Sequence, residues 1–169
     1  MMLPSIVTPA PIAPIKKNEA ARESIQQLES TIRQYLLDHA LTEPECPLAH
    51  TFAPGAYART ILIPQDTLLV GKIHRHAHLN MLMQGMVSVA TEEGPVLLQA
   101  PKIMVSKAGT KRVVYAHTEV IWTTVHLTES TDLEEIEEQI IAKTYEEFDA
   151  MQDVDVLQLL PLIRRKEEL

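Results

Sequence analysis

Short runs of β-forming residues, separated by turn signals, fill the middle of this chain from Tyr57 to about Leu127. The separators are Pro64-Gln65-Asp66, Glu92-Glu93-Gly94-Pro95, Ala108-Gly109-Thr110 and His117-Thr118-Glu119. Many short strands at such spacing are typical of a sandwich or a barrel. The sequence therefore predicts a mainly β domain.

Helical periodicity precedes this β-rich region. Asn18 is a good N-cap, and the apolar residues after it recur at helical spacing with polar residues between them. We expect an amphipathic helix over residues 19–39, within an N-terminal helical segment of residues 18–40. Residues 1–17 carry four prolines, which exclude a helix and favour an extended arm. This arm is either disordered or lies across its own barrel or a neighbouring subunit.

Helical periodicity returns after the β-rich region. Thr131-Asp132-Leu133-Glu134 has the form of a capping box, and the apolar residues after it keep helical spacing as far as Ile141. Tyr145 and Phe148 extend this predicted helix, and a second short helix is expected from roughly Val154 to Lys166. The predicted segments are the arm, the N-terminal helix, a barrel over residues 50–128 and C-terminal helices over residues 131–169.

Charge and cysteine content argue against several classes of function. The net charge of −8 disfavours non-specific nucleic-acid binding and docking on an anionic membrane, because both need a basic surface. The single cysteine, Cys46, cannot form an intramolecular disulfide, and the N-terminus lacks the features of a signal peptide. No apolar stretch approaches the ~20 residues that span a bilayer. We expect a cytoplasmic protein of one domain, without nucleic-acid or membrane partners.

A row of polar side chains is the strongest functional signal. His74, His76, His78 and Asn80 alternate with other residues, so on an extended strand they would line one wall. Three imidazoles buried in a dry core would leave several ring nitrogens without partners. The row should therefore face water, form a hydrogen-bonded network or hold a metal.

The run from about His50 to His126 resembles the cupin superfamily, whose members are small double-stranded β-helix, or jelly-roll, barrels. Gly71, His74, His76 and Gly85 match much of the first cupin motif, in which a glycine precedes an H-x-H pair and a glycine turn closes the motif. The glutamate of that motif falls on Asn80, which can coordinate only as a neutral carbonyl donor and should bind a divalent cation more weakly.

The second cupin motif resembles residues 101–112, with Gly109-Thr110 at the characteristic tight turn. The third metal histidine of the family falls on Arg112, which has no lone pair for a metal but could hold a carboxylate or a phosphate. Four other histidines are available as replacement ligands, namely His50, His78, His117 and His126.

The resemblance implies a divalent transition metal, either iron, manganese, nickel or zinc, and a small anionic ligand. The candidate metal ligands are His74, His76, His78, Asn80 and His126. The candidate ligand-binding residues are Arg112, Lys111, Asn80 and Trp122. Two simpler interpretations stay open: Arg112 and Lys111 could form surface salt bridges, and Trp122 could be a core residue.

A narrower resemblance, carried by residues 52–59, 109–112 and 122–126, is to small uncharacterised cupin-like proteins of tailed phages and prophages. It implies a bacterial host cell as the setting and assigns no reaction or catalytic residue. The leading hypothesis is a barrel that binds a metal, a small anion or both. The alternatives are a non-catalytic scaffold or interaction protein, and a sensor or sequestering protein. The arm and the flanking helices suggest a homo-oligomer, with a dimer favoured.

Overall fold

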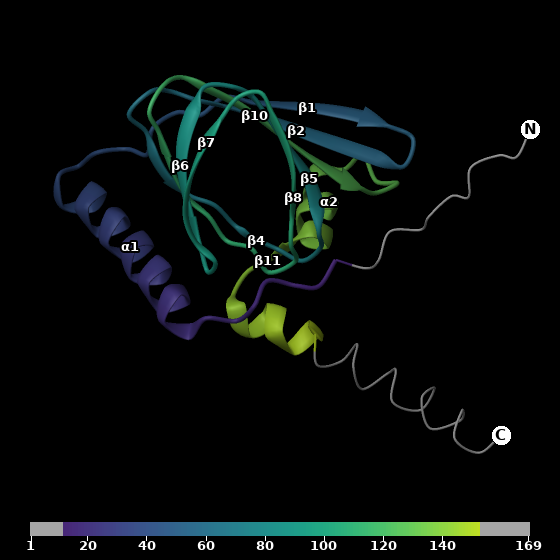
Figure 1. Cartoon of the computed structure of the whole chain (residues 1–169), viewed down its shortest axis with the longest axis horizontal. Coiled ribbons are helices and arrows are strands. Elements are labelled where there is room, and N and C mark those ends of the chain that lie inside the picture. The colour runs from purple at the N-terminus through teal and green to yellow at the C-terminus, as the bar shows by residue number, and fades with distance from the viewer. Residues whose placement is uncertain (1–11, 153–169) are drawn as a thin grey trace, which may run out of the picture.

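Two antiparallel sheets form the barrel of this protein, whose computed structural model describes residues 12–152 (Figure 1). The larger sheet contains, in spatial order, β1 (Leu48–Ala53), β2 (Ala56–Ile63), β10 (Val120–Leu127), β5 (His78–Gln84) and β8 (Lys102–Ser106). The smaller sheet contains β3 (Leu68–Val70), β9 (Val113–Ala116), β6 (Met86–Thr91) and β7 (Gly94–Gln99). A two-residue ladder joins β4 (Ile73–His74) to β11 (Ile141–Ala142).

The strand order is that of a jelly roll. In the larger sheet β2 pairs with β10 and β5 with β8, and in the smaller sheet β3 pairs with β9 and β6 with β7. Strands from the two ends of the region thus lie side by side, as in the eight-stranded double-sheet jelly roll. The predicted fold, a mainly β double-stranded β-helix with helices on both sides, is confirmed.

The barrel core lies between the sheets and follows from side-chain alternation. On β10, Val120 and Trp122 point inward and are 0% and 5% exposed. They pack in one cluster with side chains from both sheets, among them Leu82 of β5 and Val87 of β6. Trp122 is therefore a core residue, as one of the sequence interpretations held.

The N-terminal helix forms as predicted. Helix α1 spans Glu19–Asp38, and the Asn18 side chain caps it by accepting a hydrogen bond from the Ala21 N–H at 3.2 Å. The described part of the preceding arm, residues 12–17, lies against its own barrel. Ile15 is 5% exposed, and its N–H donates to the Ala108 carbonyl at 2.8 Å.

The turn at Gly109 explains how the arm and the C-terminal region meet. Gly109 has a φ of +83°, and a Cβ at this position would lie 2.5 Å from Phe148 Cε1 and 3.2 Å from Ile15 Cγ2. Only glycine leaves room for both side chains on this turn.

The C-terminal helical region differs from the prediction. Helix α2 spans Leu133–Ile140 and is capped by Asp132, whose carboxylate accepts from the N–H groups of Glu134 and Glu135. It stops at Ile140 because Ile141–Ala142 pairs with β4, and a separate helical segment covers residues 145–152. The expected single helix through Tyr145 and Phe148 is wrong. The helix predicted from Val154 to Lys166 lies outside the described residues, as do residues 1–11.

A buried arginine ties α1 to the barrel and to the C-terminal segment. Arg22 is 3% exposed, and its Nε donates to Glu92 Oε1 at 3.0 Å while its Nη1 donates to Asp149 Oδ2 at 2.8 Å. The Glu92 side chain is fully buried, and its second oxygen accepts from the Asn18 N–H at 2.9 Å.

Among the described residues, no helix is long and apolar enough to cross a membrane.

We expect Arg22→Ala to lower the free energy of unfolding by about 3–5 kcal/mol, because it leaves a buried carboxylate without its cation. Urea unfolding measures this change. Arg33→Ala is the matched control on the same helix: its side chain is 72% exposed and 4.0 Å from Glu29, so its cost should stay within about 0.5 kcal/mol. Equal costs for the two variants would contradict the anchoring role of Arg22.

Candidate metal centre

The predicted row of polar side chains is broken by a bend. His74 ends β4, His78 begins β5, and residues 75–77 form an exposed or half-exposed bend between them. Arg75 holds this bend towards the C-terminal region: its N–H donates to the Ile140 carbonyl at 2.8 Å and its Nε to the Ile141 carbonyl at 2.7 Å. The expectation of one strand wall is therefore wrong, and His76 lies exposed on the bend.

Three histidines from three strands come together inside the barrel. They are His74 of β4, His78 of β5 and His126 of β10, and one nitrogen from each lies within 4.8 Å of the others. The ring centroids are 4.1 Å apart for His74 and His78, 4.6 Å for His78 and His126, and 5.3 Å for His74 and His126. Three predicted metal ligands thus form the cluster.

The other candidate histidines have different partners. His50 Nδ1 lies 2.7 Å from the Tyr57 hydroxyl, and His117 Nε2 lies 2.7 Å from Ser88 Oγ. Neither belongs to the cluster.

Each histidine of the cluster carries a buried nitrogen without a hydrogen-bond partner among the described residues. These atoms are His74 Nδ1, His78 Nε2 and His126 Nε2. His78 Nδ1 lies 3.1 Å from the His76 carbonyl oxygen, which can only accept, so Nδ1 carries the proton and Nε2 presents its lone pair. Orphaned buried nitrogens cost free energy, and a metal ion would satisfy all three. This donor set fits a divalent transition metal.

Burial keeps the three imidazoles neutral. It lowers the pKa of His78 and of His126 from 6.5 to about 4, and it lowers the pKa of His74 well below 6.5. The neighbouring imidazoles and Arg112 add electrostatic repulsion to this effect on His74. The neutral form is the one that donates a lone pair to a metal, so the cluster is ready to bind near pH 7.

Asn80 uses its amide to order neighbouring side chains. It is fully buried, its Oδ1 accepts from Trp122 Nε1 at 2.9 Å, and its Nδ2 donates to Ser106 Oγ. The carbonyl oxygen predicted to bind a metal is thus engaged by Trp122. Asn80 and Trp122 instead form part of a cavity wall.

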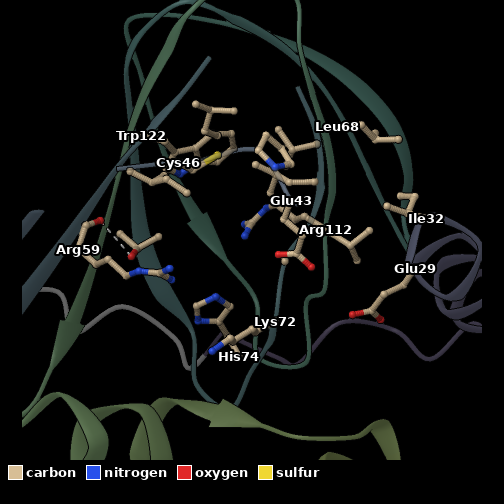
Figure 2. A pocket seen from close by; sticks show the side chains of 18 of the residues that line it. Glu29, Ile32, Glu43, Cys46, Arg59, Leu68, Lys72, His74, Arg112 and Trp122 are labelled. Atoms are coloured by element: carbon tan, nitrogen blue, oxygen red, sulfur yellow. Dashed lines mark hydrogen bonds between the residues drawn. The ribbon is translucent and has the colours of Figure 1, made fainter. Parts of the chain in front are cut away.

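A cavity of about 370 Å³ opens beside His74, the one histidine of the cluster that lines it (Figure 2). Apolar side chains from both sheets line part of its wall, Ile32 and Leu36 of α1 contribute from the helix, and charged side chains line much of the rest. Figure 2 shows the ends of Arg59, His74 and Arg112 directed towards the same part of this cavity. A smaller cavity of about 150 Å³ lies towards α2 and is lined by both His74 and His126.

Arg112 gives the larger cavity a cationic end. No carboxylate of the described residues pairs with it; its guanidinium donates to Ser106 Oγ and lies 5.7 Å from the centre of the Trp122 ring. Burial lowers the pKa of Arg112 to about 10, so the group stays charged at neutral pH. Glu29 and Glu43 also line this cavity, but neither forms a salt bridge with Arg112. A buried guanidinium without a carboxylate partner is a favourable site for an anion.

Lys111 forms a salt bridge, but a buried one in place of the surface salt bridge that the sequence left open. Its Nζ pairs with Glu29 Oε2 of α1 at 2.5 Å, and it does not line the cavity. Sequence reasoning missed Arg59, which lines both cavities. The signal was present in the alternation of β2, because Arg59 lies between the inward-facing Tyr57 and Ile61.

Comparisons with known proteins find similar solved structures only. No protein-family model matches the sequence, and no curated protein is similar to it. Solved structures similar to this chain include a cupin superfamily protein from Desulfitobacterium hafniense, with 8% identity over 51% of this chain and 80% of that chain and a TM-score of 0.44. A cupin domain from Bordetella pertussis has 15% identity over 52% of this chain and 98% of that chain, with a TM-score of 0.42.

A longer protein, an enzyme, is similar in structure to this chain over part of its length. A salicylate 1,2-dioxygenase variant from Pseudoaminobacter salicylatoxidans has 11% identity over 68% of this chain and 37% of that chain, with a TM-score of 0.48. Structural neighbours of this chain are thus cupin-superfamily proteins of low sequence identity. The fold itself rests on the strand order, and nothing about activity follows from these likenesses.

The metal-free protein should lose stability as the pH falls from about 6.5 towards about 4. In this window the histidines of the unfolded chain bind protons while His78 and His126 of the folded chain do not, so protons favour the unfolded state. Urea unfolding at several pH values, after removal of metal with a chelator, measures the slope. His126→Gln should show a shallower slope than the unmodified protein. Parallel curves for the two would contradict the neutral buried cluster.

Proposed function

We propose that this chain binds one divalent transition metal through His74, His78 and His126 and takes a small anionic ligand beside it. The proposal is carried by the histidine cluster, in which each ring has a buried nitrogen without a partner and one nitrogen of each ring lies within 4.8 Å of the others. A closed structural site would need a fourth protein ligand, and no further His, Cys, Asp or Glu of the described residues joins this cluster. Three protein ligands leave coordination positions for water or a ligand.

The cavity supports the second half of the proposal. Arg112, helped by Arg59, would hold the acidic group of the ligand, since a guanidinium can form two parallel hydrogen bonds to a carboxylate. The apolar wall around them favours a ligand with an apolar body, and a cavity of about 370 Å³ holds a small molecule. A bound metal would supply Lewis-acid polarisation of a ligand oxygen.

The chain's own residues prepare this site. The His76 carbonyl fixes which nitrogen of His78 is protonated, and Asn80 holds Trp122 and Ser106 in place. Ser106 in turn accepts a hydrogen bond from Arg112, which sets the direction of the guanidinium. Supporting contacts of this kind keep ligand-binding groups in a productive geometry.

Metal content tests the proposed binding of a metal by the three histidines. Untagged protein purified natively, or reconstituted with iron, manganese, nickel or zinc, should retain close to one equivalent by elemental mass spectrometry. His78→Ala and His126→Ala should each retain less than about a tenth of that, because two imidazoles hold a metal far more weakly than three. His76→Ala is the matched control, since His76 lies on the exposed bend, and it should retain the full equivalent. Full retention in His78→Ala and His126→Ala would overturn the proposed ligand set.

Calorimetric titration of the metal-loaded protein tests the second half, with benzoate and inorganic phosphate as probes. Benzoate should bind more tightly than phosphate because of the apolar wall. Arg112→Gln should weaken benzoate binding at least about tenfold, the loss expected from a charged hydrogen bond. Lys107→Gln removes the same charge at an exposed pair with Glu93 and should leave binding unchanged. Equal effects of the two substitutions would contradict a specific role for Arg112.

Catalytic and non-catalytic versions of this proposal use the same site. A sensor or a sequestering protein returns its ligand unchanged, while an enzyme releases a product that mass spectrometry detects. A scaffold role, a phage origin and a cytoplasmic location stay predictions of the sequence.

A further inference from the structure

The outer face of the larger sheet carries no charged side chain. Its outward positions follow from the register, in which Leu79 of β5 lies opposite Val125 of β10 and Val105 of β8. We call this surface the outer sheet face; it contains Ala49, Thr51, Ala53, Ala56, Ala58, Thr60, Leu62, Leu79, Met81, Met83, Gln84, Ile103, Val105, Ile121, Thr123, Val125 and Leu127. In a chain of which 22% of residues are charged, such a surface is unusual.

Large apolar side chains are well exposed on this face. Ile103 is 71% exposed, Met83 51%, Val105 48%, Leu79 47% and Leu127 88%. An antiparallel sheet whose inner face packs on the core normally presents polar side chains to water on its other face. A contiguous apolar surface of this kind marks a contact with another molecule.

The two threonines at the centre of the face do not need water. Thr60 and Thr123 lie opposite each other on β2 and β10, and their hydroxyl oxygens are 2.8 Å apart in a hydrogen bond. Thr123 is already 4% exposed. A partner could therefore cover the centre of the face without leaving a buried hydroxyl unsatisfied.

We propose that a second copy of this chain packs on the outer sheet face, so that the protein is a two-fold symmetric dimer. A copy carries the same net charge of −8, so an uncharged face lets two copies meet with little local charge repulsion. A two-fold axis brings one patch against the same patch, and an uncharged apolar face is complementary to itself. Obligate dimer interfaces have this apolar character.

The size of the face suits such a dimer. Five strands about 4.8 Å apart, each rising about 3.4 Å per residue, give a flat area on the order of 500 Å². The protruding side chains increase the accessible area further, towards the ~800 Å² per partner of a standard interface. The smaller sheet is less suitable, since its outer side carries Ser88 bonded to His117 and Tyr115 bonded to Asp66.

The dimer goes beyond the proposed function and does not depend on it. Strands β5 and β10 present the candidate metal ligands His78 and His126 on their inner side and the outer sheet face on the other. The second copy would thus stiffen the two central strands from behind, and neither copy would block the cavity.

Sedimentation equilibrium of the full chain over a wide range of protein concentration tests the proposal. The unmodified protein should be a dimer. Ile103→Lys and Leu79→Lys, made separately, should each weaken self-association at least about a hundredfold, because each would bury an unpaired ammonium group in the interface. Leu97→Lys is the matched control: Leu97 is 60% exposed on β7 of the smaller sheet, and this variant should stay dimeric.

Far-ultraviolet circular dichroism and a cooperative urea transition confirm that each variant is folded. If one lysine variant fails to fold, the other and Val105→Glu carry the test. A monomeric unmodified protein would overturn the proposal. If Ile103→Lys then also lowered the free energy of unfolding of the monomer, a segment of the same chain would cover the face instead. If the dimer dissociates in Leu97→Lys but persists in Ile103→Lys, the interface lies on the smaller sheet. That result would also overturn the proposal.

Discussion

The central position of β10 between β2 and β5 is the constraint on which the rest of the structure depends. Its register places Trp122 opposite Ile61 and Leu82, and Thr124 opposite Arg59 and Asn80. Because facing residues of an antiparallel sheet share one side, this pairing collects core, cavity and histidine residues on the inner surface. A slip of one residue would move His126 and Trp122 to the outside and bring Thr123 and Val125 into the barrel.

Arg112 changes the electrostatics of the candidate site. The cupin resemblance places a metal histidine at this position, and the structure presents a buried guanidinium there instead, while the third imidazole comes from His126 on β10. A fixed positive charge beside the imidazoles opposes a cation among them. An anion held between Arg112 and the metal would remove this repulsion, so the two halves of the proposed function support each other: whichever binds first favours the other.

Sequence reasoning succeeded where the determinants are local. Turn residues and the alternation of β10 predicted the barrel, and the Asn18 cap predicted the start of α1, because these signals lie within a few residues of the feature they specify. It failed at the bend after His74 and at the end of α2. Both depend on Arg75 meeting Ile140 and Ile141, which are about 65 residues away in the chain. The row of histidines showed which residues could bind a metal, but only this distant contact decides that His76 turns outward.

Contacts between residues far apart in the sequence also fix helix α1 against the cavity in the barrel. The cavity wall is completed by Ile32 and Leu36, and the helix that carries them is fixed through Arg22 and through the pair of Glu29 with Lys111. Lys111 is adjacent in sequence to Arg112, so the residue that anchors α1 directly precedes the one that faces the cavity. A shift of α1 would therefore open the cavity and change the backbone beside the guanidinium together. The geometry of the anion-binding end is thus linked to the helix that covers it, and the jelly roll alone does not determine it.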